Sequence, residues 1–306
     1  MLKSEINNVW IESLSDNFDI LFEHYSQLLD ALVFLFFNDK KSHEIENERL
    51  YHIDLLSQKF IFHAHAIKSI ITGYNLNISS FQIHILDPFS VIILKRALIE
   101  NYLTIDYLNE RNNAELAVLR FNIWMYHGLI NRNINDLVSI EATNTKKSDT
   151  ESLKDLEVQI RESVIFCKLS KENQISFFEK LKYKWIIQFN GKKYIPRGYQ
   201  YLLNKIGLKE KIGKGLYTFL SWHAHSQSIS SLQLAEMYDS GMDKVNIKLS
   251  TQELSIFIAF LINDLILLNN DIKSSYDNLP DYQKQLILFY NYIYRDESFI
   301  FEKLED

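Results

Sequence analysis

The stretch "PFSVIILKRALIENYLTIDYL", residues 88–108, decides the fold class. Asp87 supplies a helix N-cap, and Pro88 occupies the first helical position, where proline is favoured. Apolar residues then cover nearly every side of the predicted helix. Because that distribution is typical of a buried helix, the sequence predicts a helix at the centre of the protein.

The composition extends this prediction to the whole chain. Of the 306 residues, 47% are hydrophobic, and only 8 are glycine and 3 are proline. So few turn-forming residues favour few, long elements, and apolar residues recur at helical spacing. We predict an all-α, multi-helix bundle with helices over residues 4–38, 42–73, 88–111, 113–138, 149–182, 198–206, 211–236, 252–276 and 281–304. The first of these helices is expected to break near Ser15.

One segment departs from the helical pattern. The stretch "WIIQFNGKKYI", residues 185–195, places an Asn-Gly pair between two β-prone runs. This is the strongest short-range pattern for a hairpin with a type I′ turn, so we expect a small β-hairpin insertion. Its Trp185, Phe189 and Tyr194 either form a small hydrophobic core or, beside the lysines, bind single-stranded nucleic acid.

The chain length allows one large domain or two smaller ones. We predict a single helical domain over residues 1–306. The alternative is a division into residues 1–141 and 149–306 around a polar linker at 142–148.

Several patterns bear on cellular location and cofactors. Cys167 is the only cysteine, and the N-terminal segment lacks the apolar core of a signal peptide. The longest apolar run, residues 254–268, is shorter than the roughly 20 residues of a membrane span. We therefore expect a cytoplasmic protein without a membrane partner. Neither GxxxxGK[ST] nor GxGxxG occurs, so we predict no cofactor.

The charge is unevenly distributed along the chain. The net charge is −6, yet residues 179–214 contain ten Lys and Arg against Glu179 and Glu210, a net +8. Such a segment can attract phosphates, or it is simply a solvated connection. If the partner is RNA, the candidate binding residues are Lys184, Lys192, Lys193 and Arg197.

Two charges interrupt the central helix. Arg96 lies among apolar residues, and Glu100 follows four residues later on the same face. An exposed pair of this spacing is favourable with the acid first, whereas here the arginine comes first. Because buried charges are costly unless they are paired, the two residues form either a structural ion pair between helices or part of a polar site.

Two His-Ala-His triplets, "IFHAHAIKS" at 61–69 and "SWHAHSQS" at 221–228, suggest a metal site. Residues two apart on a helix point about 200° apart, so neither pair can bind one ion, and we predict no metal. The alternative is a metal site that takes one histidine from each helix together with Glu100 or Asp264. We expect His63 and His65 to pack in the core or an interface. In the second triplet, we expect His223 to pack and His225 to form a polar site with Ser221.

The motifs "ILKRALIENYLTIDYL" and "LYTFLSWHAHSQS" resemble a broad bacterial family of uncharacterised all-helical proteins. Its members carry R-x-x-x-E on one helix and an L-S-x-x-x-H-x-S-like motif on a later helix. The resemblance covers about residues 90–235 and implies a helical fold with a polar cluster. The matching residues are Arg96, Glu100, Leu220, Ser221 and His225.

The stretch "RFNIWMYH" resembles the R-x(4–6)-H motif of HEPN ribonucleases, which are helical and common in toxin–antitoxin and anti-phage systems. The matching residues are Arg120 and His127, which share one helical face. Phe121 stands where members of that family often have a polar residue. The resemblance implies RNA cleavage without a metal ion.

Metal-independent RNA cleavage needs a base, an acid and a cation near the phosphate. Histidine suits the first two roles and arginine the third, so the candidate catalytic sets are Arg120 with His127, or Arg96 and Glu100 with His225. Ser221 and His225 also have the spacing of a nucleophile and its base, but no G-x-S-x-G motif accompanies them.

Two hypotheses follow. The first is a HEPN-like helical effector that acts on RNA, with metal-independent endoribonuclease activity in a defence or toxin setting as its more specific form. The second is a non-enzymatic binding or scaffold protein whose polar cluster is structural or binds a small anionic ligand. The many apolar helices also favour a helix-mediated homodimer.

Overall fold

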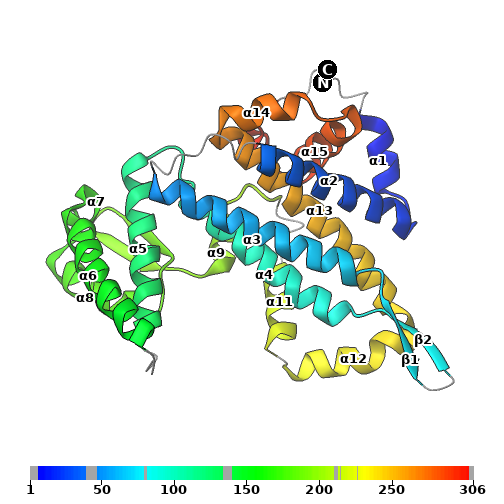
Figure 1. Cartoon of the computed structure of the whole chain (residues 1–306), viewed down its shortest axis with the longest axis horizontal. Helices are drawn as coiled ribbons and strands as arrows, with labels where there is room; N and C mark the ends of the chain where they lie inside the picture. The colour runs from blue at the N-terminus through cyan, green and yellow to red at the C-terminus, as the bar shows by residue number, and fades with distance from the viewer. Residues whose placement is uncertain are drawn as a thin grey trace. The chain divides into compact units, whose positions relative to one another are not determined.

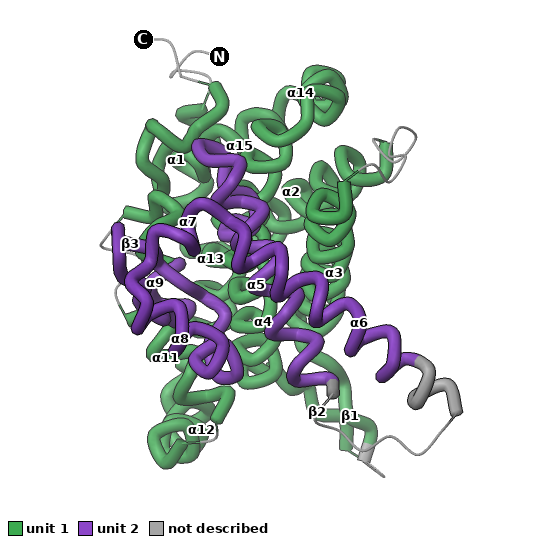
Figure 2. Tube along the Cα trace, turned by 90° about the vertical axis from the view of Figure 1, so that its left-hand side faces the viewer, with its two compact units in different colours: residues 1–105, 203–306 green, residues 106–202 purple. Residues whose placement is uncertain are grey.

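The computed structural model describes residues 6–38, 47–78, 81–133, 140–209, 213, 215–225 and 227–302. Most of these residues are helical, and the strands form two antiparallel hairpins, so the predicted all-α bundle with a hairpin insertion is confirmed. The chain forms two compact units (Figures 1 and 2). Unit 1 contains residues 1–105 and 203–306, and unit 2 contains residues 106–202.

Unit 1 is built around helix α13 (Met242–Leu268), whose apolar residues from Leu254 onward are buried on nearly every side. It packs most extensively against α2 (Phe18–Asn38) and α15 (Asp281–Tyr294). The other elements are α1 (Asn7–Ser13), α3 (Glu48–Ile70), β1 (Tyr74–Ile78), β2 (Phe81–Ile85), α4 (Pro88–Leu108, its last turn in unit 2), α11 (Leu216–Ala224), α12 (Ser228–Ser240), α14 (Asn270–Asp277) and η3 (Glu297–Phe299).

Helices α2 and α13 are long and apolar enough to cross a membrane by length and composition. In the structure, 56% and 78% of their most apolar windows are buried inside the protein. Packing in the core of unit 1 therefore accounts for their composition.

Unit 2 has a hydrophobic core of its own, with Phe177 fully buried at its centre. Trp185, Phe189 and Tyr194 pack against this core, and the Tyr194 ring lies 4.9 Å from that of Phe177. The expected hairpin is therefore present, and its aromatic residues hold it down. The elements are α5 (Ala114–Asn133), α6 (Ile140–Glu162), α7 (Val164–Cys167), α8 (Lys171–Leu181), β3 (Ile187–Asn190), β4 (Lys193–Pro196) and α9 (Tyr199–Leu203).

Several predicted boundaries were wrong. The helix expected over 149–182 is divided into α6, α7 and α8, because the side chains of Ser163 and Ser170 cap new helix starts. The helix expected over 211–236 is interrupted between α11 and α12. Residues 142–148, the suggested linker, belong to α6, and the two units divide the chain elsewhere.

The first hairpin, β1–β2, was not predicted. Its strands pair antiparallel, with Tyr74 opposite Ile85 and Leu76 opposite Ile83. Gly73, at φ +79°, leads into β1, and a Cβ there would lie 2.6 Å from the carbonyl oxygen of Ile85. Only glycine therefore fits this entry without strain.

Candidate functional site

Arg96 and Glu100 form an ion pair on α4, as their spacing suggested. Arg96 Nε donates to Glu100 Oε1 at 2.8 Å. Tyr217, on α11, completes the cluster: its hydroxyl lies 3.2 Å from Arg96 Nη2 and 2.8 Å from Glu100 Oε1. The three side chains therefore connect α4 to α11 within unit 1.

The environment keeps Arg96 and Tyr217 in their ordinary protonation states. Burial opposes the charge of Arg96, but Glu100 and Tyr217 outweigh it, so the pKa of Arg96 is raised. Burial, together with the Glu100 carboxylate, raises the pKa of Tyr217 to about 12. The neutral Tyr217 and the ion-paired Arg96 therefore link the two helices, and neither of these two residues can act as a base at neutral pH.

Lys95 forms a second bridge from α4, which the sequence did not reveal. It is only 2% exposed, and its Nζ contacts Glu253 and, at 3.0 Å, the hydroxyl of Ser250, both on α13. The sequence predicted that a helix begins at residue 252, between Ser250 and Glu253, but α13 starts at Met242. The two residues are instead the partners that a buried lysine requires.

The two histidines of the second triplet lie in different environments, as helix geometry requires. His223 is 4% exposed, and its ring lies 4.7 Å from that of Phe219 and 5.6 Å from that of Phe89. His225 is exposed at the end of α11. His223 is therefore a packing residue, as predicted.

His225 does not join the Arg96 cluster. Among the described residues, no hydrogen bond or ion pair connects its ring to Arg96 or Glu100. Its contact with Ser221 is a backbone hydrogen bond of 3.2 Å, donated by the His225 N–H. Tyr217 takes the place that the sequence gave to His225.

The first triplet was predicted to lie in the core or an interface. His63 is half-buried, and its Nε2 is buried without a hydrogen bond. His65 is exposed, so the expectation of a core position was wrong for this residue. The helical stripe that contains Phe60, Ala64 and Ile67 points inward instead.

Arg120, on α5, makes its contacts with the last turn of α4 and the segment that follows it. Its Nη1 donates to Glu110 Oε2 at 2.8 Å and to the Tyr107 carbonyl at 3.2 Å. Its guanidinium also lies over the Tyr107 ring, 4.3 Å from the centroid. These contacts stabilise the segment that follows α4.

His127 is engaged elsewhere in unit 2. Its Nδ1 donates to the carbonyl of Leu181 at the end of α8, and its Nε2 accepts from Asn131 Nδ2 at 3.0 Å. No hydrogen bond among the described residues joins His127 to Arg120. Both ring nitrogens are therefore occupied in packing α5 against α8.

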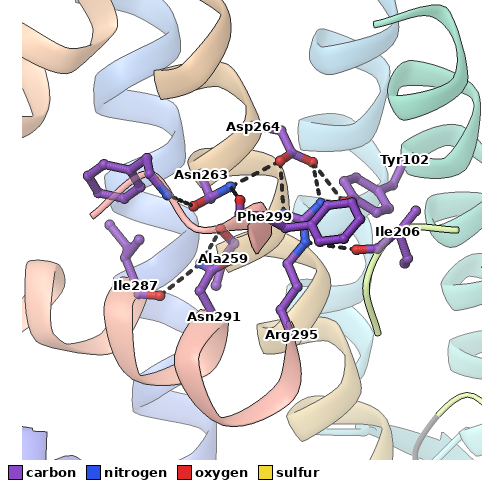
Figure 3. A network of polar contacts seen from close by, with 10 residues as sticks. Tyr102, Ile206, Ala259, Asn263, Asp264, Ile287, Asn291, Arg295 and Phe299 are labelled. Atoms are coloured by element: carbon purple, nitrogen blue, oxygen red, sulfur yellow. Dashed lines mark hydrogen bonds and ion pairs between the residues drawn. The ribbon is translucent and has the colours of Figure 1, made fainter. Parts of the chain in front are cut away.

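A third polar network lies in the core of unit 1 (Figure 3). Arg295 is fully buried, and its guanidinium donates to both carboxylate oxygens of Asp264, at 2.8 and 3.2 Å. The Tyr102 hydroxyl donates to Asp264 Oδ2 at 2.8 Å, and Arg295 Nε donates to the Ile206 carbonyl at 2.8 Å. The network joins α4, α13, the end of α15 and the chain near Ile206.

This third network has the character of a structural core. Asn263 extends it, donating to Asp264 Oδ1 at 3.0 Å and to the Phe299 carbonyl at 2.8 Å. A buried ion pair persists when geometry and further hydrogen bonds compensate the loss of water. In the sequence, Asp264 lies within the longest apolar run and was named only as an alternative metal ligand, and Arg295 belongs to no motif.

The basic residues of the second hairpin remain available to a partner. Lys184, Lys192 and Lys193 are exposed. Arg197 is instead held by Gln188, whose Oε1 accepts from its Nε at 2.9 Å and its Nη2 at 2.7 Å. Of the four predicted binding residues, three are thus exposed, while Glu210, Lys211 and Lys214 of the basic segment lie outside the described residues.

The hairpin turn lies against the start of α8. The Lys192 carbonyl accepts from the backbone N–H of Ser170 at 3.0 Å and from the side chain of Asn173 at 2.9 Å. The exposed Lys168 and Lys171 flank that position in the sequence. At the other end of α8, Tyr183 is 81% exposed between two exposed lysines.

Among the residues that the structure describes, no three His, Cys, Asp or Glu side chains are grouped closely enough to hold a metal ion. No protein-family model, curated protein or solved structure matches the chain. The two resemblances found in the sequence therefore stay hypotheses.

Proposed function

We propose that the chain is a helical RNA-binding protein that holds its partner without cleaving it, and that unit 2 makes the contact. Unit 2 contains 15 Lys and Arg against 12 Asp and Glu, a net +3, whereas unit 1 has 18 against 27, a net −9. A polyanion is therefore attracted to unit 2 and repelled by unit 1.

The carrying observation is the combination of an exposed aromatic ring with exposed lysines along α8. Tyr183 lies between Lys182 and Lys184, and Lys192 and Lys193 lie at the hairpin turn near the other end of that helix. Proteins that bind single strands combine cations for the backbone with aromatic rings on which bases stack. The length of α8, about 16 Å at 1.5 Å per residue, suits several nucleotides.

The state of the candidate catalytic residues favours binding over cleavage. Arg120 and His127 each make intrachain hydrogen bonds that use the groups needed for catalysis. The charge of Arg96 is compensated by Glu100, and His225 lies apart from both. Cleavage would require these contacts to be exchanged for contacts with the substrate.

Binding is tested by fluorescence anisotropy with a labelled 12-nucleotide single-stranded RNA at fixed salt. We expect K192E/K193E to weaken binding at least tenfold, because two phosphate contacts become repulsive. The matched control is K59E/K273E, which reverses two exposed lysines of unit 1 and should leave affinity within twofold. Equal losses in the two variants would contradict a site on unit 2.

Tyr183→Ala separates stacking from charge. Stacking contributes about 1–3 kcal/mol per base, so affinity should fall several-fold or more at every salt concentration. The same RNA, incubated with the parent protein and analysed by gel, should remain intact. Cleavage that His127→Ala abolishes would contradict the non-enzymatic proposal and support the ribonuclease hypothesis.

A further inference from the structure

The β1–β2 hairpin is amphipathic, and its apolar face is uncovered. Cross-strand pairs alternate strictly: Tyr74 lies opposite Ile85 and Leu76 opposite Ile83, while Asn75 lies opposite His84 between them. Side chains on successive residues point to opposite faces of a strand, so the apolar members share one face. A face of this composition normally packs on a core.

This apolar face is not buried by the described part of the chain. Phe81 is 70% exposed, Ile83 47%, Tyr74 43% and Leu76 37%. In Figure 1, the hairpin extends away from the helices of unit 1 that carry it. A two-stranded hairpin is marginally stable in water, whereas additional strands with an apolar face stabilise it.

Within the described ranges, no other strand pairs with either edge of this hairpin. The two strands form a sheet on their own, so each has an outer edge of backbone groups. Soluble proteins usually protect such edges with charged residues or proline. Residues 74–85 contain no Lys, Arg, Asp, Glu or Pro.

We propose that β2 pairs antiparallel with β2 of a second copy of this chain, so that the two hairpins form one four-stranded sheet. Centred on Ile83, this arrangement places Phe81 of each copy opposite Ile85 of the other, and Gln82 opposite His84. Every apolar side chain then lies on the same face of the joint sheet. An uncharged strand suits a twofold axis, because a charged strand would meet like charges there.

Helix α12 extends the apolar surface beside the hairpin. The Tyr238 hydroxyl donates to the Leu86 carbonyl at 2.7 Å, which holds α12 at the base of β2. Leu234 lies four residues before Tyr238, on the same face of this helix, and is 46% exposed. The contact between copies therefore has side-chain surface to bury in addition to the backbone hydrogen bonds of the strands.

The acidic surroundings favour a second protein chain over a membrane. Asp87 and Asp243 lie near Tyr238, whose pKa they raise together with burial, and Asp239 is exposed on α12. Membrane surfaces that carry anionic lipids attract basic segments and repel acidic ones. A second copy meets the hairpin through uncharged residues only.

Cysteine cross-linking tests the predicted register in the full chain. With the exposed native thiol removed by Cys167→Ser, I83C should form a disulfide-linked dimer on mild oxidation, because the two Cα atoms face each other about 5 Å apart. L76C is the matched control: two copies of β1 lie about 14 Å apart, beyond disulfide reach. Cross-linking through L76C but not I83C, or through neither, would overturn the proposal.

The mass in solution gives a second, independent test. Light scattering should give twice the chain mass for the parent and the single-chain mass for F81K/I83K, with an unchanged helical circular dichroism spectrum. Flotation with vesicles of 30% anionic lipid tests the other possible partner of the apolar face, a membrane surface. A monomeric parent, or a parent that floats with vesicles through Phe81, would contradict pairing between copies, and neither result depends on RNA binding.

Discussion

The two hairpins have similar strand pairing but opposite relations to the rest of the fold. In β3–β4, the aromatic side chains pack on the core around Phe177, and the lysines point to solvent. In β1–β2, apolar side chains such as Phe81 point to solvent, and no charged residue lies on either strand. The β3–β4 hairpin is completed within its own unit, whereas the apolar face of the β1–β2 hairpin is left uncovered by the described residues.

The largest expected effect is on the free energy of unfolding, and it distinguishes the buried core beneath β3–β4 from the exposed side chains of β1–β2. Phe177→Ala should lower the free energy of unfolding by about 3–5 kcal/mol, because it empties the centre of the unit 2 core. Phe81→Ala, the same change in β1–β2, should alter it by less than about 0.5 kcal/mol at concentrations where copies are apart. Urea denaturation measures both, and a comparable loss for Phe81→Ala would show that this hairpin is covered after all.

The next effect concerns charge on β3–β4. The logarithm of the RNA binding constant should fall linearly with the logarithm of salt concentration, with a slope of about −0.7 per phosphate contacted. K192E/K193E should make that slope shallower by about 1.4, as two contacts are lost. Anisotropy titrations at several salt concentrations test this, with K59E/K273E expected to keep the parent slope.

The glycines of the hairpins give a smaller contrast. Gly191, at φ +57°, has open space around it, so Gly191→Ala should cost only the strain of the left-handed conformation, about 1–2 kcal/mol. Gly73→Ala adds a clash with the Ile85 backbone to the strain of the left-handed conformation. Local opening of the uncovered β1–β2 hairpin would relieve both the clash and the conformational strain. We expect faster amide exchange over residues 74–85 with stability nearly unchanged. A global loss larger than that of Gly191→Ala would argue that β1–β2 is part of the core.

The smallest expected effect on the free energy of unfolding comes from the contrast between the buried His223 and the exposed His225. Both ring nitrogens of His223 are buried without hydrogen bonds, so His223→Phe should stabilise the protein by about 1 kcal/mol at pH 7.5. Burial lowers the pKa of His223, so below about pH 6.5 the unfolded chain binds more protons and the parent loses stability. The advantage of His223→Phe should therefore grow between pH 7.5 and 5.5 in thermal unfolding.

The matched variant for that measurement is His225→Phe. His225 is exposed, so the substitution should change the free energy of unfolding by less than about 0.5 kcal/mol at pH 7.5. A stabilisation equal to that of His223→Phe would contradict the assignment of one histidine to the interior and one to the surface.

The hairpins also show how far the sequence could predict this structure. The Asn190–Gly191 pair predicted the β3–β4 hairpin correctly, because that dipeptide favours a tight turn between strands. The turn itself lies one residue later than predicted, since Asn190 pairs with Lys193 and the turn residues are Gly191 and Lys192. β1–β2 was missed because two serines separate its strands in the sequence, without a glycine or asparagine turn pair. The strict alternation in "YNLNI" and "FQIHI" was nevertheless present and is typical of strands.

The polar clusters were harder to predict, because their partners are distant in sequence. Arg96 and Glu100 are four residues apart and were found by spacing. Arg295 and Asp264 are connected only through the packing of α15 on α13, and Lys95 reaches Glu253 across 158 residues. Tyr217, in the first turn of α11, is the partner of Arg96 and Glu100, whereas His225 is the C-cap at the other end of that helix.

The central claim is that the two hairpins meet different partners, RNA at β3–β4 and a second copy at β1–β2. Hydrogen–deuterium exchange measures both in one protein, with and without single-stranded RNA and at low and high protein concentration. We predict that RNA slows exchange over residues 168–197 and leaves 74–85 unchanged, while raising the protein concentration slows exchange over 74–85 alone. Protection of 74–85 by RNA, or no concentration dependence there, would contradict the account.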